Sequence, residues 1–473
     1  MVPPSPLPVA NPTTSFWRRH PHPLDDYRST PDVPSQVDIA VVGAGYAGVS
    51  TVHHVLDICK RRGTAPPDMV ILDARQACSG ATGRNGGHLK PDPLNRPASL
   101  VITHGIEVAA ECATFEARNL SAVKKTIEDE DIDCDFVLTR AVDVSMSDSV
   151  CSKMKSGFDM LRKHAFPGMQ DVHFAKGADA ERVASRITLS SLSGVKGAKG
   201  CLSYSAGHLF PYKLILHLLS SAVDAGVNLQ THTPVTEATK LPDAEGYFTL
   251  TTPRGSIRAK KIVYATNGYT SSLLPEFADT IIPARGICSH IKPAKDPGPF
   301  LPNSYMIRWS DTEYEYLIPR PDGSIVVGGA RSEFYHELDS WYNNVNDDML
   351  IESATTYFDG YMQRVFQGWE DSGAYTSKLW TGIMGYSSDS MPHIGLVPGR
   401  ENQFILAGFT GHGMPQIFLA ARGIASMIID DVDFQSTGIP TLYMATQARL
   451  DNPKNWILDS WRETHKRLEA SKL

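Results

Sequence analysis

The chain has 473 residues and a net charge of −7 at pH 7, with 42% hydrophobic and 21% charged residues. This composition is ordinary for a globular protein, and the slightly acidic balance gives no reason to expect a nucleic-acid partner. No apolar run approaches the roughly 20 residues that cross a bilayer, so no membrane partner is expected. A single hydrophobic core stops growing near ~250–300 residues, so two domains, sequential or intertwined, are predicted.

Residues 1–35 are rich in proline and predict an extended arm on the body of the protein, anchored by Phe16 and Trp17. No basic segment followed by an apolar one occurs here, so no secretory signal is predicted. The 7 cysteines are scattered without a C-x-x-C pair, which indicates neither a disulfide framework nor a zinc site. No bound metal is expected.

The most informative stretch is residues 37–48, where a buried-strand pattern runs into Gly43-x-Gly45-x-x-Gly48 and then into a helix. In order, these glycines suit a tight turn, close approach of the backbone to a pyrophosphate, and packing of the helix on the strand. The helix, at about 46–59, presents its N-terminus to the phosphates. This pattern predicts a dinucleotide-binding turn.

A second strand at residues 69–72 ends at Asp73, whose carboxylate is placed to bind the ribose hydroxyls of the nucleotide. No second copy of the glycine motif occurs in the chain. One dinucleotide is therefore expected, which argues against flavoenzymes that also hold a nicotinamide nucleotide.

Periodicity and turn signals predict the remaining elements. Helices are predicted at 106–128 and 211–225, strands at 136–138, 142–144 and 227–235, and hairpins at 247–265 and 314–329. The strand at 227–235 is expected to be parallel to those of the nucleotide domain. This mixture predicts an α/β fold, in which a Rossmann-like FAD-binding domain is built from separated segments and carries an inserted antiparallel-sheet substrate domain (α+β).

Four further segments carry the family resemblance: residues 79–88, 263–270, 380–395 and 407–414. In order and spacing they resemble the FAD-dependent D-amino acid oxidase superfamily, and most closely its γ-glutamylputrescine oxidase and sarcosine-oxidase-like branch. The resemblance spans about residues 16–435. It implies an N-terminal arm (1–35), an FAD-binding domain (36–95, 200–272 and 376–435), a substrate-binding domain (96–199 and 273–375) and a C-terminal tail (436–473).

The resemblance also implies which residues bind FAD. They are Gly43, Gly45, Tyr46, Ala47, Gly48, Asp73, Ala74, Thr82, Arg84, Asn85, Gly86, Gly87, His88, Val235, Thr266, Asn267, Gly268, Asp389, Gly395, Gly411, His412, Gly413 and Met414. Pro415 is expected to be the first residue of a helix whose N-terminus stabilises negative charge on the reduced flavin.

The chain departs from the sarcosine-oxidase-like pattern at two places. Pro415 stands where those relatives have a lysine that binds the substrate carboxylate. No cysteine follows Cys288, which excludes the C-terminal cysteinyl flavin linkage of several relatives. Noncovalent FAD is expected, and attachment through His88 or Cys78 stays open.

The predicted catalytic residues are His412, Tyr314, Tyr316, Arg308 and Lys292. The two tyrosines share one face of their strand, so they either wall a pocket for a cationic amine or pack beneath the sheet. An arginine, Arg308 or Arg320, offers a fork for a carboxylate. Lys292 is a candidate for activating oxygen, and His290 and Trp380 are further candidates for facing the flavin.

The predicted activity is oxidation of an amine or amino-acid C–N bond, with hydride transfer to flavin N5, an imine product, and reoxidation by O2 to hydrogen peroxide. A secondary amine and a polyamine derivative both fit. One alternative is a dehydrogenase that uses another electron acceptor, and a second is a flavin-binding scaffold without turnover. The terminal Ser471-Lys472-Leu473 predicts recognition by the peroxisomal import receptor, with a flexible tail from Arg462 onward.

Overall fold

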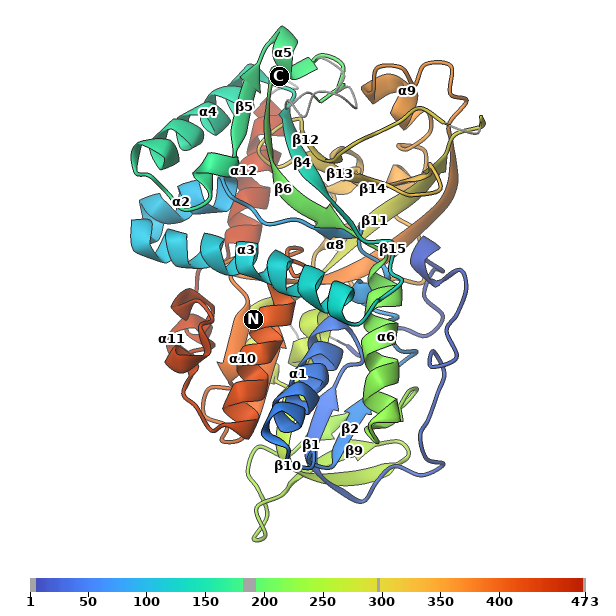
Figure 1. The fold of residues 1–473 in the computed structure, drawn as a ribbon, viewed down its shortest axis with the longest axis vertical. Coiled ribbons are helices and arrows are strands. Elements are labelled where there is room, and N and C mark those ends of the chain that lie inside the picture. Colours follow the sequence, from blue (N-terminus) through green and yellow to red (C-terminus); the bar gives the residue numbers. More distant parts are fainter. Residues whose placement is uncertain (1–5, 182–192, 296–297, 471–473) are drawn as a thin grey trace.

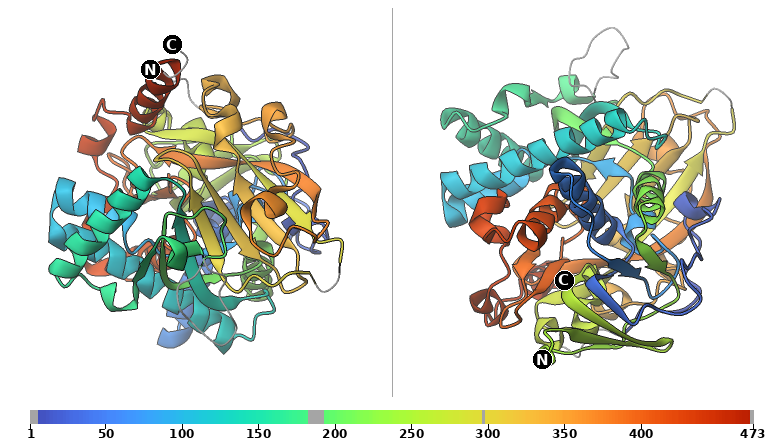
Figure 2. Two further views of the ribbon diagram at one scale, coloured as in Figure 1. Left: turned by 90° about the horizontal axis from the view of Figure 1, so that it is seen from above. Right: turned by 60° about the horizontal axis from the view of Figure 1, so that its bottom comes forward.

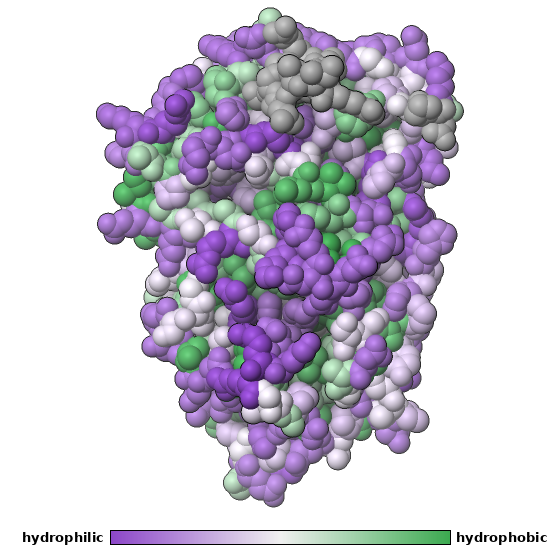
Figure 3. Space-filling model, viewed as in Figure 1, coloured by the Kyte–Doolittle hydropathy of each residue, from purple (hydrophilic) through white to green (hydrophobic). Residues whose placement is uncertain are grey.

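The structure, a computed structural model, describes residues 6–181, 193–295 and 298–470, with the side chains of 467–470 left aside. Two β-sheets occupy the lower and upper parts of the molecule in Figure 1. Hydrophilic side chains dominate the face shown in Figure 3, with apolar ones gathered near mid-height. Within the described ranges, no helix combines the length and the apolar character that crossing a membrane demands.

The first sheet contains the glycine-rich turn. Its strands span Gln36–Val42 (β1), Met69–Leu72 (β2), Asn228–Gln230 (β7), Glu237–Ala238 (β8), Phe248–Thr252 (β9), Gly255–Tyr264 (β10), His393–Leu396 (β16) and Gln403–Ala407 (β17). The order is β16-β17-β10-β1-β2-β7, with β8 and β9 attached beside β10. Pairing is parallel from β17 through β7, and β16 is antiparallel at the edge. The central strands are apolar on both faces, as a covered parallel sheet requires.

The second sheet is mostly antiparallel. Its strands span His88–Leu89 (β3), Val137–Ser145 (β4), His173–Lys176 (β5), Gly200–His208 (β6), Ile281–Lys292 (β11), Ser304–Arg308 (β12), Tyr314–Pro319 (β13), Ile325–Gly329 (β14) and Tyr375–Ser387 (β15). Their order is β15-β11-β14-β13-β12-β4-β6-β3, with β5 beside β6. Among the described strands of this sheet, the one parallel pair joins β12 to β4.

The helices surround and join the two sheets. They span Tyr46–Arg62 (α1), Asn95–His104 (α2), Ile106–Asp129 (α3), Asp148–Lys163 (α4), Ala178–Glu181 (α5), Pro211–Asp224 (α6), Arg331–Phe334 (α7), Leu338–Trp341 (α8), Tyr361–Val365 (α9), Ile417–Ile429 (α10), Gln447–Leu450 (α11) and Trp456–Ala470 (α12). Figures 1 and 2 show α10, α1 and α6 side by side on the first sheet. Helix α3 crosses between the two halves and packs on α10.

The predicted fold class is confirmed: a Rossmann-like sheet and a second, mostly antiparallel sheet are both present. Helices α3 and α6 and the two hairpins, β9–β10 and β13–β14, lie where they were predicted. The strands predicted at 136–138 and 142–144 form a single strand, β4, because the intervening residues continue the pairing with β6.

Three predicted domain segments and the tail differ from the structure. Strands β3, β6 and β15, from segments assigned to the FAD-binding domain, pair within the second sheet, because an apolar strand pattern does not reveal which sheet it joins. Residues 456–470 form helix α12 rather than a flexible tail, since Ile457 is buried and Trp456 Nε1 donates to the Ser387 carbonyl over 2.7 Å. Residues 471–473 lie outside the described residues, so the peroxisomal signal stays a prediction.

The N-terminal arm is anchored as predicted. Phe16 and Trp17 are each only 1% exposed and pack edge to face against one another. Trp17 Nε1 donates to the Asn85 carbonyl, and Arg28 forms an antiparallel bridge with Gln230 at the edge of the first sheet. The arm therefore joins the glycine-rich segment after β2 to the body of the protein.

Candidate active site

A first cavity, of about 140 Å³, lies at the carboxyl ends of β1, β2 and β10, where α1 begins. Ligands of open parallel sheets bind at this edge, and the N-terminus of a helix favours phosphate. Of the residues predicted to bind FAD, eleven line this cavity: Gly43, Gly45, Tyr46, Ala47, Asp73, Ala74, Thr82, Val235, Thr266, Asn267 and Gly268. We call it the nucleotide cavity.

The glycine turn is fixed by close packing. Gly43 has φ of +115°, and a Cβ there would lie 2.6 Å from the Ala265 carbonyl oxygen. Gly48 does not line the nucleotide cavity; a Cβ there would lie 2.0 Å from the Gly43 oxygen. Gly48 therefore serves the packing of α1 on β1, which is the role that the motif predicts for its last glycine.

Asp73 stands at the end of β2 with its carboxylate held by the backbone. One oxygen accepts from the Ala44 amide over 2.8 Å and the other from the Arg75 amide over 2.9 Å. Burial raises the pKa of Asp73 above its ordinary value. A carboxylate has about four acceptor positions, so this one retains capacity for ribose hydroxyls.

A larger cavity of about 370 Å³ adjoins the nucleotide cavity, and we call it the reaction cavity. The two share part of their lining: Tyr46, Ala81, Thr82, Asn267, Ile383, Phe409 and Ile417. Other predicted flavin contacts line only the reaction cavity: Arg84, Asn85, Gly86, His88, Gly411, His412, Gly413 and Met414. The backbone approaches closely at Gly86, where a Cβ would lie 2.4 Å from the Tyr316 ring. Gly87, at φ of +79°, instead packs against Ile318.

His412 is held in place from α3. Its Nε2 lies 2.9 Å from Oε2 of Glu116, a side chain that is 2% exposed. Gln416 Nε2 donates to the other oxygen over 2.8 Å. The helix predicted from Pro415 begins two residues later, at Ile417, because residues 413–416 first form a tighter turn.

The opposite wall of the reaction cavity is basic and aromatic. Arg308, Tyr314 and Tyr316 all line it, so the tyrosines wall a pocket rather than only packing beneath the sheet. Arg331 Nη1 donates to the Tyr314 hydroxyl over 3.3 Å. The Tyr316 hydroxyl lies 3.2 Å from Cys288 Sγ.

Several predicted residues lie away from both cavities. Lys292 is exposed at the end of β11, and His290 stacks on Phe16 with ring centroids 3.9 Å apart. Trp380 donates to the Arg84 carbonyl over 2.8 Å, and Arg320 pairs with Asp135 at 2.6 Å.

Two predicted flavin contacts also lie outside the cavities. Asp389 pairs with Arg449 at 2.8 Å, and a Cβ on Gly395 would meet the Phe434 ring at 3.1 Å. The motif that contains Asp389 and Gly395 therefore makes structural contacts within the protein. Arg449 also contacts His393 of this motif from 56 residues further along the chain, so no local sequence pattern indicates that the two segments meet.

A family model described as FAD dependent oxidoreductase (DAO) matches residues 38–427. The chain belongs to this family. γ-Glutamylputrescine oxidoreductase of Escherichia coli (strain K12) is 21% identical over 399 residues, which cover 84% of each chain.

Solved structures show the same fold. The L-amino acid deaminase of Proteus myxofaciens aligns over 96% of this chain and 100% of its own, with a TM-score of 0.67 and 14% identity. Glycine oxidase from Bacillus cereus ATCC 14579 aligns over 85% of this chain and 98% of its own, with a TM-score of 0.65 and 16% identity. At these identities the likeness concerns the fold.

FAD is the cofactor of this oxidoreductase, and the two joined cavities fit its two parts. The nucleotide cavity offers Asp73 and the start of α1 to the adenosine and pyrophosphate. The reaction cavity, with its glycine-bearing edge at Gly86, offers room for a flat ring system. The two cavities share part of their lining, so a single dinucleotide can extend from one cavity into the other.

The linkage of the flavin stays a prediction, with both candidate residues beside the cavities. His88 lines the reaction cavity, and its Nε2 is buried without a hydrogen-bond partner among the described residues. Burial lowers the pKa of His88 to about 3, so its ring is neutral at pH 7. Cys78 lines the nucleotide cavity, and burial raises the pKa of its thiol.

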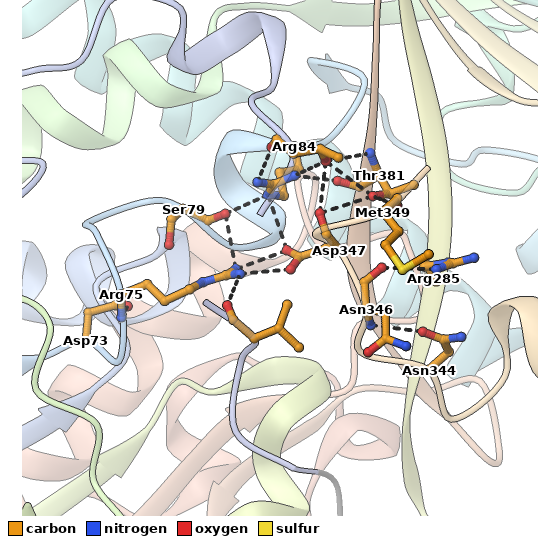
Figure 4. Close-up of polar contacts among 12 residues, drawn as sticks. Asp73, Arg75, Ser79, Arg84, Arg285, Asn344, Asn346, Asp347, Met349 and Thr381 are labelled. Atoms are coloured by element: carbon orange, nitrogen blue, oxygen red, sulfur yellow. Dashed lines mark hydrogen bonds and ion pairs between the residues drawn. The ribbon is translucent and has the colours of Figure 1, made fainter. Parts of the chain in front are cut away.

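A buried ion cluster lies between the two cavities (Figure 4). Arg75 makes a bidentate contact with Asp347, at 2.8 and 3.1 Å, and Arg84 Nε lies 3.4 Å from the same carboxylate. Asp347 is fully buried, and its backbone carbonyl accepts from the Thr13 amide over 2.7 Å. The cluster thus ties the arm, the segment after β2 and the loop after α8 together.

Among the residues of the reaction cavity or its support that sequence reasoning missed are Lys90, Glu116, Arg285, Arg331 and Tyr386. They come from five separate segments, and only Tyr386 belongs to one of the motif segments, residues 380–395, where no role was predicted for it. The one available signal was Glu116, a carboxylate on the apolar side of a predicted helix, where a charge needs a partner.

Proposed function

We propose that this flavoprotein is an oxidase of the C–N bond of an amine or amino acid, with O2 as electron acceptor and hydrogen peroxide as product. The observation that carries the proposal is the reaction cavity. It brings the Gly-His-Gly segment, Gly86 from the segment after β2, and a wall of Arg308, Tyr314 and Tyr316 around one space next to the nucleotide cavity. The names of relatives such as γ-glutamylputrescine oxidoreductase and glycine oxidase support this class of substrate.

Bound FAD would supply the two-electron acceptor that no amino-acid side chain provides. The substrate would lose a hydride from carbon and a proton from nitrogen to give an imine, which water hydrolyses to a carbonyl product and an amine. The chain's part is to hold the substrate with its C–H bond in position and to exclude water. Tyr314, Tyr316 and Ile287 supply the aromatic and apolar surface for this.

Acid–base demands on the chain are small, because the substrate can bind with its nitrogen neutral. His88 is neutral at pH 7, since burial lowers its pKa to about 3, so it adds no positive charge beside the amine. His412 must carry a proton on Nε2 as long as Glu116 is ionised, because a carboxylate only accepts. His412 is thus a fixed donor to Glu116 rather than a free base.

The test is peroxide release in air by the purified, FAD-loaded protein. The panel contains sarcosine, pipecolate, proline, D-amino acids, putrescine, γ-glutamylputrescine and glycated amino acids. Peroxide at one equivalent per amine oxidised is expected. Bleaching of the flavin without peroxide would establish a dehydrogenase instead, and no bleaching with any amine or amino acid would contradict the proposal.

A further inference from the structure

The reaction cavity is strongly basic. Its described lining includes the cations Arg84, Lys90, Arg285, Arg308 and Arg331. No aspartate or glutamate stands among the described residues that line it. The carboxylates that pair with Arg84, Lys90 and Arg308 lie outside this lining. Arg285 has no ion pair among the described residues and donates to the Asn346 carbonyl over 3.1 Å.

Arg331 has no carboxylate partner among the residues that the structure describes. It begins α7, directly after β14, and its guanidinium carbon lies 4.1 Å from the Tyr335 ring centre and 5.4 Å from that of Tyr314. It donates a hydrogen bond to the Tyr314 hydroxyl, and no ion pair of Arg331 occurs within the described part of the chain. A half-buried guanidinium with a planar fork and only aromatic neighbours is suited to a carboxylate ligand.

Lys90 and Arg308 share one carboxylate. Asp143, 1% exposed, lies 2.9 Å from Lys90 Nζ and 3.2 Å from Arg308 Nη2. Although burial alone would raise it, these two cations lower the pKa of Asp143 to about 2. Asp143 is the one carboxylate within ion-pair distance of these two cations among the described residues, and Asp92, which acts on Arg308 from farther away, also faces Arg96. The pair Lys90 and Arg308 therefore keeps positive charge that Asp143 alone does not compensate. Arg308 Nε is also buried without a hydrogen-bond partner in the described structure, so this group has donor capacity left.

Two of the incompletely compensated cations, Arg308 and Arg331, flank the same ring. The guanidinium carbon of Arg308 lies 5.9 Å from the Tyr314 ring centre, and that of Arg331 lies 5.4 Å from it. Both side chains line the one cavity, so one small molecule can contact both. Arg84 shares Asp347 with Arg75, but its guanidinium already donates to the carbonyls of Ser79, Thr381 and Thr13.

We propose that the substrate is an amine bearing two acidic groups, one held by Arg331 and the other by Arg308 with Lys90. This inference rests on the proposed function and narrows its substrate class: a dicationic polyamine would be repelled, and a monocarboxylate would neutralise only one of the two charges. Lys90, Arg308 and Arg331 are then specificity-determining residues.

The experiment uses FAD-loaded protein and a matched pair of ligands in which sulfur replaces the amine nitrogen, thiodiacetate and methylthioacetate. Neither can form an imine, so binding is measured by perturbation of the flavin absorbance without turnover. Thiodiacetate is expected to bind at least about tenfold more tightly, the scale of one charge-assisted hydrogen-bonded contact. Equal binding of the two ligands would overturn the inference.

Variants identify the subsites. Arg331→Met and Lys90→Met are each expected to bring the ratio of the two affinities toward one, whereas Lys292→Met, at an exposed lysine of the same sheet, leaves it unchanged. Arg331→Lys retains the charge but loses the fork, and an intermediate ratio is expected if the methionine variant does not fold. An unchanged ratio in both Arg331 variants would refute the assignment of that residue.

Turnover separates this inference from the function on which it rests. Iminodiacetate and sarcosine differ by one carboxylate, and iminodiacetate is expected to reduce the flavin with the higher kcat/KM. Equal kcat/KM, or faster reduction by putrescine, would contradict the inference and leave the oxidase intact. Tight thiodiacetate binding with no amine able to reduce the flavin would support the two subsites and refute the oxidase.

Discussion

Glu116 fixes the proton of His412. The buried carboxylate, on α3, lies 2.9 Å from the imidazole Nε2 of a histidine that lines the reaction cavity almost three hundred residues later in the chain. Burial alone would raise the pKa of Glu116, but His412 beside it lowers the pKa below its ordinary value. The ionised carboxylate accepts and cannot donate, so it sets both the tautomer and the orientation of the ring.

The substitution Glu116→Gln should therefore destabilise the folded protein. The amide retains the shape but removes the charge and can donate to Nε2, which disfavours the native tautomer. We expect a loss of about 1–3 kcal/mol in the free energy of unfolding at pH 7, measured by urea denaturation. Because the depressed pKa stabilises the folded state only while the carboxyl is ionised, the difference from wild type should shrink as the pH falls below 4.5.

The matched control is Glu107→Gln, an exposed glutamate in the first turn of the same helix. It should cost no more than a few tenths of a kcal/mol, with no effect on FAD affinity. A loss of stability in Glu116→Gln that persists unchanged at pH 3 would show that the charge of Glu116 is not what stabilises His412.

The nucleotide half of the site could be predicted from sequence because its residues act through the backbone over short distances. Gly43, Gly48 and Asp73 lie within one strand–helix–strand unit, so their spacing alone fixes their geometry. The basic wall could not be predicted, since Lys90, Arg308 and Arg331 meet only when β3, β12 and the end of β14 enter one sheet. Charge at these positions has no local signature.

Lys292 and Asp389 lie outside both cavities for the same reason. The β-bulge between His290 and Ile291 changes the register of β11 against β15 just before Lys292, and the sequence gives no sign of it. A slip of one position moves a side chain to the other face of a sheet. Asp389 was assigned from its motif, and its partner, Arg449, lies in a region that carried no motif.

Asp347→Asn tests the buried cluster between the cavities. The change leaves Arg75 and Arg84 without a counter-charge in the interior, which typically costs about 3–5 kcal/mol when one partner of a buried pair is removed. The expected result is a drop of that size in the free energy of unfolding of the apoprotein, together with weaker FAD binding. The neighbouring Asp348 is exposed, so Asp348→Asn should leave both unchanged. Equal effects of the two variants would contradict a special role for the cluster.

Gly43→Ala tests the dinucleotide turn. A methyl group at this position would lie 2.6 Å from the Ala265 carbonyl oxygen, at a φ of +115°, so β1 and β10 would have to separate beside the nucleotide cavity. We expect FAD affinity to fall by more than about tenfold, measured by quenching of flavin fluorescence. Gly63→Ala is the control, since Gly63 also has positive φ, +66°, but a Cβ there meets nothing within 4 Å. It should cost about 1 kcal/mol of stability through backbone strain and leave FAD affinity intact.

The contribution of Glu315 to the stability of the folded protein depends on pH in the opposite sense to that of Glu116. Its carboxylate, 1% exposed, accepts from the Tyr357 hydroxyl over 2.8 Å and from Trp309, and burial raises its pKa to about 7. Between pH 4.5 and 7 the folded protein therefore binds a proton that the unfolded chain has lost, so this group's contribution to stability falls as the pH rises through that window.

The variant Glu315→Gln keeps a hydrogen-bonding group without the charge. Its stability should be close to that of wild type at pH 5 and higher by up to about 3 kcal/mol at pH 8. Urea denaturation of both proteins across this range is the measurement. A difference that is the same at pH 5 and pH 8 would mean that Glu315 does not titrate in the folded state within the window.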